Sequence, residues 1–241
     1  MKAVVVVVVA VVAVVTAACG AQPAKDVGAL LFRDARTSGS EVNKFSCATC
    51  HGDNGAAGDN PALIHAGFDL SQAALRTRYW GGYAPTMLDA TNACLTFFMR
   101  GAPLAKDDPK ARALYEYLAS LPSSSSSSSS QTAPDLPLTI VENVTTVARG
   151  SKSKGAAVWD NACRVCHGDP HTGNGRLTET ASLVPEASIE FGKQIHFSAD
   201  LVVIEKIRHG AFFGVGGTMP PFSKEQLSDD NVGALVAFLG L

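Results

Sequence analysis

Apolar residues recur at helical spacing near the end of each half of this chain, and each run follows a strong helix start. Residues 113–118 carry apolar side chains on one helical face, and residues 107–109 before them read Asp-Asp-Pro. Residues 232–239 repeat that pattern after Ser-Asp-Asp at residues 228–230. Serine and aspartate cap helix N-termini, and proline is favoured in the first helical turn. Both segments are therefore predicted to form helices that close their half of the chain.

Four further segments show helical spacing, and one segment favours a strand. The additional predicted helices are residues 27–35, 88–99, 155–161 and 198–209. Gly210 follows the last of them and is expected to end it. Residues 138–147 are rich in β-branched side chains and are the best strand candidate. The overall pattern predicts an all-α fold.

The first nineteen residues are interpreted as a signal peptide. Lys2 precedes an almost pure Val and Ala run at residues 3–15, which is short for a membrane span. Residues 16–20, Thr-Ala-Ala-Cys-Gly, resemble a bacterial lipobox, in which Cys19 is acylated. A plain cleaved signal with an incidental Cys19 is the alternative. We expect a lipid anchor that holds the protein on the periplasmic side of a bacterial membrane.

Residues 122–137 divide the rest of the chain into two parts. Eight consecutive serines with prolines on either side cannot form a core, so this segment is predicted to be a flexible linker. It separates two expected domains, residues 26–121 and residues 138–241. The formal net charge of −2 argues against a nucleic-acid partner.

Two pentapeptides share the pattern Cys-x-x-Cys-His, at residues 47–51 and 163–167. On a helical turn the two cysteines project from one side and can each bond a porphyrin vinyl group, while the histidine binds the iron. A thioredoxin-like redox pair or half a zinc site fits a single Cys-x-x-Cys better than two copies that both end in His-Gly. We therefore expect two covalently bound haem c groups. The predicted attachment residues are Cys47, Cys50, Cys163 and Cys166, with His51 and His167 as iron ligands.

The order of elements is the same in both halves: helix, haem motif, loops, ligand loop and closing helix. This order resembles the class I cytochrome c fold, twice over. The resemblance implies two tandem class I cytochrome c domains joined by the Ser/Pro linker. In that class the axial methionine typically lies in a Met-Pro stretch before the closing helix.

Met219 is the predicted sixth ligand of the second haem, because residues 216–222 read Gly-Gly-Thr-Met-Pro-Pro-Phe. Proline fixes the backbone there, and a thioether sulfur favours reduced iron. Met219 as an ordinary core residue is the alternative. His171, His196 and His209 are rival ligands, of which His209 is interpreted as structural because it ends a helix.

Four side chains compete for the sixth position at the first haem: Cys94, Met99, Met87 and His65. Aligning the two closing helices places Met99 within about two positions of Met219. However, residues 88–94, 97–104 and 113–118 resemble the haem domain of thiosulfate dehydrogenases. In that family an Asn-x-Cys element supplies a cysteine thiolate as the distal ligand. The resemblance implies Cys94 as the ligand, which would also explain this otherwise unassigned cysteine.

Two classes of function follow from these assignments. The expected one is a membrane-tethered carrier that transfers electrons between periplasmic redox proteins through weak, small interfaces. The alternative is an enzyme that oxidises thiosulfate to tetrathionate at the first haem, with Arg76, Arg78 and Arg100 receiving the anion. Pairing with haem propionates or exposure to solvent is the favoured explanation of those arginines. A di-haem peroxidase fits poorly, because both haems are expected to have six ligands.

Four aromatic side chains are assigned to packing rather than to chemistry. They are Phe32, Trp80, Trp159 and Phe222. A cysteine ligand at the first haem would lower its potential, whereas a methionine at the second would raise it. Electrons would then run from the first haem to the second.

Overall fold

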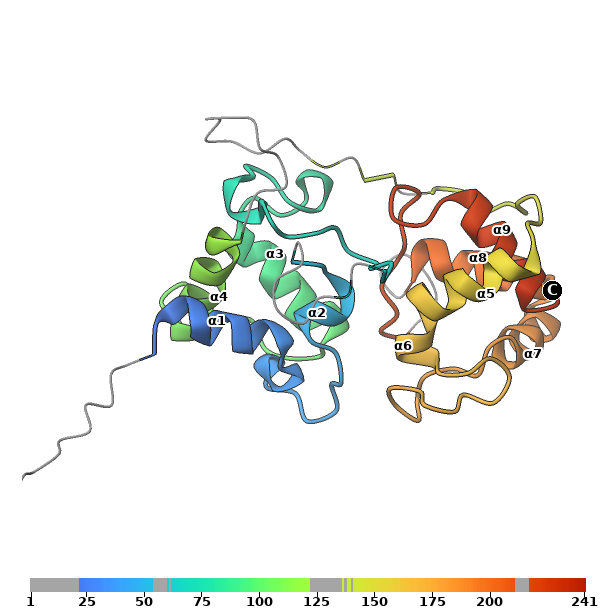
Figure 1. Cartoon of the computed structure of the whole chain (residues 1–241), viewed down its shortest axis with the longest axis horizontal. Helices are drawn as coiled ribbons and strands as arrows, with labels where there is room; N and C mark the ends of the chain where they lie inside the picture. The colour runs from blue at the N-terminus through green and yellow to red at the C-terminus, as the bar shows by residue number, and fades with distance from the viewer. Residues whose placement is uncertain are drawn as a thin grey trace, which may run out of the picture.

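The computed structural model describes residues 22–53, 60, 62–121, 136, 138–139, 141–210 and 217–241. These residues form helices and loops without a named strand, which confirms the predicted all-α class (Figure 1). The β pairing found among them is an isolated bridge between Tyr79 and Ala84. Across these ranges no helix has the length and apolar character needed to cross a bilayer. Cys19 and nearly all of the Ser/Pro segment lie outside the described residues.

The N-terminal half, residues 22–121, contains four labelled helices. They are α1 (Ala24–Arg33), α2 (Cys47–Cys50), α3 (Met87–Ala93) and α4 (Pro109–Ser120). Short 3-10 turns lie at Ala35–Ser38, Ala73–Leu75 and Trp80–Gly82, and a π-helical turn, Cys94–Phe98, continues α3. The predicted cap of α4 is confirmed, because the Asp108 carboxylate accepts from the Lys110 amide.

The C-terminal half, residues 138–241, contains five labelled helices. They are α5 (Lys152–Val158), α6 (Arg164–His167), α7 (Glu186–Ile195), α8 (Ala199–His209) and α9 (Asp229–Phe238), with a π-helical turn, Trp159–Cys163, between α5 and α6. Ser228 caps α9 by accepting from the Asn231 amide, as predicted. Gly210, with φ of 55°, ends α8 as predicted.

The two halves share one helix crossing. In each half the helix before the haem motif packs on the closing helix: α1 on α4 and α5 on α9 (Figure 1). Both crossings are made at a glycine. A Cβ on Gly28 would stand 2.0 Å from the Ala113 carbonyl oxygen, and a Cβ on Gly155 would stand 2.0 Å from the Ala234 carbonyl oxygen. The backbones therefore touch at both sites.

An aromatic pair lies one turn beyond each glycine. The rings of Phe32 and Tyr117 are 5.4 Å apart between centroids, and those of Trp159 and Phe238 are 6.4 Å apart. In both pairs the first residue follows the crossing glycine by four positions and the second follows the facing alanine by four. The two halves thus repeat both the crossing and the side chains that surround it.

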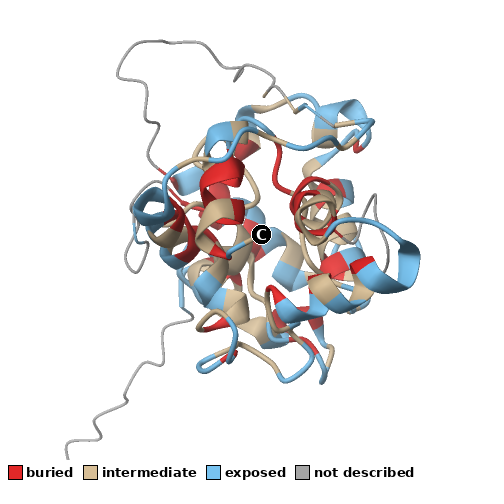
Figure 2. Ribbon diagram, turned by 90° about the vertical axis from the view of Figure 1, so that its right-hand side faces the viewer, coloured by how far each residue is buried: buried red, intermediate tan, exposed pale blue. Residues whose placement is uncertain are grey.

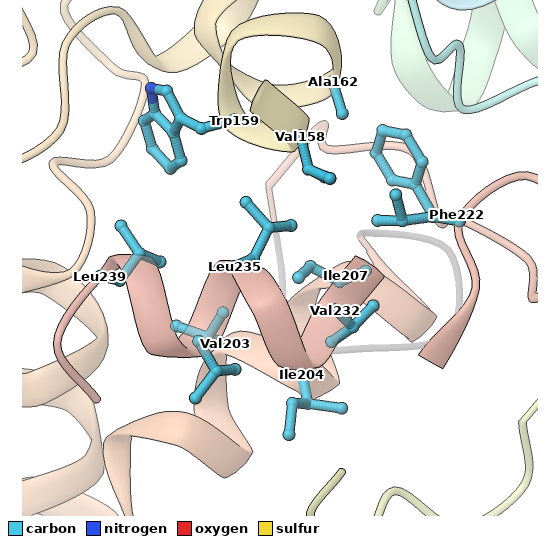
Figure 3. Packing of buried hydrophobic residues seen from close by; sticks show 12 residues of the cluster. Val158, Trp159, Ala162, Val203, Ile204, Ile207, Phe222, Val232, Leu235 and Leu239 are labelled. Atoms are coloured by element: carbon cyan, nitrogen blue, oxygen red, sulfur yellow. The ribbon is translucent and has the colours of Figure 1, made fainter. Parts of the chain in front are cut away.

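Each half has its own hydrophobic cluster. The N-terminal one centres on Phe32, Leu114, Tyr117, Leu118 and Leu121. The C-terminal one is larger and lies between α5, α8 and α9, with Trp159 above Leu235 and Leu239 (Figure 3). Buried residues line the inward faces of the helices, and exposed ones lie outside (Figure 2). Phe32, Trp159 and Phe222 are buried, as predicted for packing residues.

The strand expected at residues 138–147 is wrong for the described part of that segment, which forms a loop with a bend at residues 142–143. Val144 and Val147 pack against the C-terminal cluster, and Val141 accepts a hydrogen bond from His209 Nε2 at 2.5 Å. β-Branched residues favour strands only where a neighbouring strand pairs with them. Here the segment lies against helices instead, so its valines pack one by one.

Candidate functional site

The first Cys-x-x-Cys-His motif lies on the short helix α2. Ser46 and Thr49 form a capping box at its start, and the Ser46 amide donates to Thr49 Oγ1 at 3.0 Å. Cys47 and Cys50 begin and end this single turn, so their side chains project from the same side. His51 follows in an extended conformation.

The second motif begins where a π-helical turn meets α6. Cys163 ends that turn, and Cys166 and His167 end α6. The Trp159 indole donates to the Gly168 carbonyl at 3.0 Å, which ties the aromatic residue of the helix crossing to the residue after the motif histidine. The attachment turn is therefore anchored directly to the core of this half.

Both motif histidines are oriented by a hydrogen bond at Nδ1. His51 Nδ1 lies 2.8 Å from the Phe68 carbonyl oxygen, and His167 Nδ1 lies 2.9 Å from the Ser182 carbonyl oxygen. A carbonyl only accepts, so Nδ1 carries the proton and Nε2 keeps its lone pair. Burial lowers the pKa of both histidines, which favours this neutral form. Each imidazole is thus prepared to bind a metal through Nε2.

Gly67 packs flat against the first of these imidazoles. A Cβ at this position would stand 2.2 Å from His51 Cε1 and 2.4 Å from His51 Nδ1. The Gly67 amide also donates to the Cys50 carbonyl at 2.8 Å. The absence of a side chain at Gly67 is therefore what allows the loop to cover the histidine ring.

The described cysteines are all free of disulfides and partly buried. Burial raises the pKa of Cys47 and Cys166 to about 11 and of Cys163 to about 12, and it raises the pKa of Cys50 further. Within the described ranges no three His, Cys, Asp or Glu side chains are grouped to hold a metal ion. These residues hence do not assemble the four ligands of a structural zinc site.

Met219 packs against the C-terminal cluster, to which Cys163 also contributes. Its segment is fixed on both sides. A Cβ on Gly210 would stand 2.4 Å from the Met219 carbonyl oxygen, and the Phe222 amide donates to the Ile207 carbonyl at 2.7 Å. The chain therefore brings the predicted thioether ligand and one attachment cysteine into the same cluster.

The four candidates at the first haem occupy different places. Cys94 starts the π-helical turn after α3 and lies near Cys47, whose thiol together with burial raises the Cys94 pKa to about 12. Met99 follows that turn and is 4% exposed. Met87 packs against the N-terminal cluster beside Cys47. His65 is close enough to His51 to contribute to lowering its pKa. The choice among these four candidates stays a prediction.

The three arginines considered as anion ligands are dispersed. Arg76 is partly buried, its Nη2 donates to the Asp69 carbonyl at 3.0 Å, and its Nε has no hydrogen-bond partner. Arg78 is exposed. Arg100 has a positive φ of 53° and donates to the Gly217 carbonyl at 2.7 Å. Arg76 Nε finds no hydrogen-bond partner among the described residues, so this guanidinium could bind a haem propionate.

The rival histidines have other contacts. His171 pairs with Glu186 at 2.7 Å on the surface, and His196 adopts a left-handed conformation at the end of α7. His209 donates to the Val141 carbonyl and lies 3.2 Å from Glu205, which fits its predicted structural role.

Two buried polar networks were not predicted from the sequence. In the N-terminal half, Asp53 accepts from Arg33 and, at 2.5 Å, from the Tyr117 hydroxyl. In the C-terminal half, Arg208 is buried and bonded to three carbonyls and Asp229. The sequence holds one signal for the first network. Asp53 lies two positions after His51, and Asp169 lies two positions after His167, so an aspartate recurs at this place in both halves.

These donor sets fit covalently bound haem, because each half presents two cysteines on one turn beside a neutral imidazole with a fixed Nδ1. Comparison with protein families agrees for the C-terminal half. Residues 150–239 match the family model for cytochrome c oxidase, cbb3-type, subunit III. A search of curated proteins gave no match. The comparisons therefore do not support the thiosulfate dehydrogenase alternative. They support a c-type cytochrome, an electron-transferring protein with covalently bound haem c in a cytochrome c domain at residues 150–239.

Proposed function

We propose that this protein is a di-haem c-type cytochrome built from two tandem cytochrome c domains, and that it carries electrons between redox partners. The observation that carries the proposal is the repeat of one arrangement in both halves. A glycine crossing at Gly28 or Gly155, an aromatic pair beyond it and a Cys-x-x-Cys-His turn recur together. The matched cytochrome c domain contains one complete copy of this arrangement.

Haem c supplies one-electron chemistry when it is bound, and the protein residues set how that chemistry is used. The Nδ1 hydrogen bonds of His51 and His167 leave the Nε2 lone pairs available, so these two side chains would bind the haem irons. Met219 is proposed as the sixth ligand in the C-terminal half. Its thioether favours the reduced state and raises the potential of that centre.

Cys94 is proposed as the sixth ligand in the N-terminal half. A thiolate there would lower the potential, so electrons would pass from the N-terminal centre to the C-terminal one. The raised thiol pKa of about 12 does not oppose this assignment, because a coordinating metal deprotonates a thiol outright.

The proposed location is the periplasmic face of a bacterial membrane, with a lipid anchor at Cys19. The Val- and Ala-rich first residues and the Thr-Ala-Ala-Cys-Gly sequence support it. Other redox proteins are the proposed partners, and they would meet the protein through small, transient interfaces.

Counting haems in the purified protein tests the proposal most directly. A pyridine haemochrome assay is expected to give two haems per chain. The double variant Cys47→Ala/Cys50→Ala and the double variant Cys163→Ala/Cys166→Ala should each retain one. One haem in the native chain would overturn the di-haem assignment. Separately, Cys19→Ser should move the protein from the membrane fraction to the soluble periplasmic fraction.

A further inference from the structure

A short segment of the N-terminal half connects the two haem-attachment turns. At one end the Gly67 amide donates to the Cys50 carbonyl at 2.8 Å. At the other end the Ile64 amide donates to the Asn161 carbonyl at 2.8 Å, and Asn161 belongs to the π-helical turn that ends at Cys163. Residues 64–67 thus join the first Cys-x-x-Cys to the turn that leads into the second by backbone hydrogen bonds.

The same segment is packed as well as bonded. Ile64 and Ala66 lie against the hydrophobic cluster of the C-terminal half, although both belong to the N-terminal half. Figure 1 shows α2 and α6, which carry the two motifs, on the sides of the two halves that face each other. The contact therefore lies where the attachment turns approach.

A second contact joins the segments that carry candidate distal ligands. Arg100 directly follows Met99, and its guanidinium donates to the Gly217 carbonyl at 2.7 Å, two residues before Met219. Arg100 has a φ of 53°, a left-handed conformation that a non-glycine residue keeps only where the surrounding structure holds it. The Ile64 contact thus reaches the turn before the second haem motif, and the Arg100 contact reaches the segment that carries Met219.

We infer that these two contacts hold the halves in one arrangement and that electrons pass between the two haems within a single molecule. This inference rests on the proposed function, since it needs a haem in each half. In the step, one electron leaves the reduced N-terminal centre, which is oxidised, and reduces the C-terminal centre. No bond is made or broken, and an external one-electron donor supplies the electron. Ile64 and Arg100 act as positioning residues.

Two domains of one chain reorient relative to each other unless an interface holds them. Among the described residues this interface rests on the Ile64 and Arg100 hydrogen bonds and on the packing of Ile64 and Ala66, so substitutions at Ile64 and Arg100 together should release it. That sensitivity makes the inference testable.

The experiment uses the full-length protein with its haems attached. Ile64→Glu places a charge against the C-terminal cluster, and Arg100→Ala removes the second contact. Arg112→Ala is the matched control, because Arg112 is exposed on α4, a helix that lies on the side of the N-terminal half away from the C-terminal half (Figure 1). Haem content and circular dichroism of each variant establish that it is folded. Small-angle X-ray scattering then measures the arrangement of the halves, and photoreduction with less than one electron per molecule measures transfer between haems.

Native protein and Arg112→Ala should scatter as a compact particle, with a transfer rate that is independent of protein concentration. The double variant Ile64→Glu/Arg100→Ala should scatter as two separated lobes. Its transfer rate should fall by roughly tenfold or more, because the halves must then meet by domain motion. The milder variant Ile64→Ala should have a transfer rate between that of the native protein and that of the double variant.

Either of two results overturns the inference. One is native scattering that already shows separated halves. The other is an unchanged transfer rate in the folded double variant. A haem count of one per chain would instead overturn the proposed function, and the scattering would still report whether the halves are held together.

Discussion

The guanidinium of Arg208 donates to the carboxylate of Asp229 at 2.7 Å, which ties the end of α8 to the start of α9. The side chain of Arg208 is 2% exposed. It also donates to three carbonyl oxygens, those of Phe222, Ser223 and Leu227, at 2.7–3.2 Å. These acceptors follow Met219 in the chain, so one buried cation holds the segment that carries the predicted methionine ligand.

Arg208→Met should therefore destabilise the C-terminal half. Removing the guanidinium leaves three buried carbonyls without this donor, at a cost of about 1–3 kcal/mol for a buried acceptor left unsatisfied, whereas Asp229 keeps Lys224. Urea unfolding followed by circular dichroism measures it. The absorption band of methionine-ligated ferric haem should weaken as well, because the Met219 segment loses its support.

Lys224→Met is the matched control for Arg208→Met. Lys224 bonds the same carboxylate, Asp229, at 2.8 Å, but its side chain is 46% exposed. Exposed pairs contribute about 0–1 kcal/mol, so this variant should unfold almost as the native protein does. Equal losses in the two variants would show that the carbonyl contacts of Arg208 do not stabilise the loop.

Gly155→Ala tests the shared helix crossing. The added methyl group would stand 2.0 Å from the Ala234 carbonyl oxygen, so α5 and α9 must separate. Overpacking of this kind costs about 1–3 kcal/mol. Gly28→Ala should have a similar effect between α1 and α4. Ala157→Val adds carbon atoms to an exposed position of α5 and should cost less than about 1 kcal/mol.

Thermal unfolding of these three variants gives the comparison. If Gly155→Ala and Ala157→Val lower the melting temperature equally, the backbone contact at the crossing is not what stabilises this half. If Gly155→Ala lowers the melting temperature and Gly28→Ala does not, the glycine crossing stabilises only the C-terminal half. The proposed repeat would then lose its energetic support.

Local signals predicted much of the fold. Asp108 and Ser228 cap α4 and α9 as expected, because a cap depends on residues within one turn. Helix α7 was not predicted, since Pro185 gives it no side-chain cap and Gly192 lies within it. That glycine is explained by the turn that ends the helix, because a Cβ there would stand 2.6 Å from the Phe197 carbonyl oxygen.

In the candidate site, too, the features that depend on local sequence were predictable and the long-range contacts were not. The two attachment motifs follow from residue spacing, but the partners of Arg208 lie 14–21 positions away, and Ile64 meets Asn161 across the two halves. Such contacts depend on how helices pack, which local periodicity does not specify. The error at residues 138–147 has the same origin, because β-propensity does not reveal whether a partner strand exists.

Substitution of Cys94 and Met99 separates the two leading ligand candidates at the first haem. If Cys94 is the ligand, low-temperature electron paramagnetic resonance of the oxidised protein should show a low-spin histidine–thiolate signal. Cys94→Ala should abolish that signal. Met99→Leu should leave it unchanged, because leucine fills a similar volume at this buried position.

The opposite pattern would reassign the ligand. A native signal that survives Cys94→Ala and disappears in Met99→Leu would make methionine the ligand in both halves. The two centres would then have similar potentials, and the proposed direction of electron flow would lose its basis.

Tyr117→Phe should change how stability depends on alkaline pH. Burial and the hydrogen bond to the Asp53 carboxylate raise the pKa of Tyr117 from 10 to about 12. The folded protein thus holds this proton more tightly than the unfolded chain does. The resulting stability is fully present below pH 10 and is lost as the pH rises from 10 to about 12.

The phenylalanine variant lacks this proton, so its deficit relative to the native protein should shrink across that pH range. At neutral pH it should lose about 1–2 kcal/mol, because Asp53 keeps Arg33 but loses a hydroxyl donor. Unfolding free energies at neutral pH and between pH 10 and 12 measure both effects. Tyr115→Phe, at an exposed position of the same helix, should change neither. A deficit for Tyr117→Phe that stays constant up to pH 12 would mean that Tyr117 does not hold its proton more tightly in the folded protein.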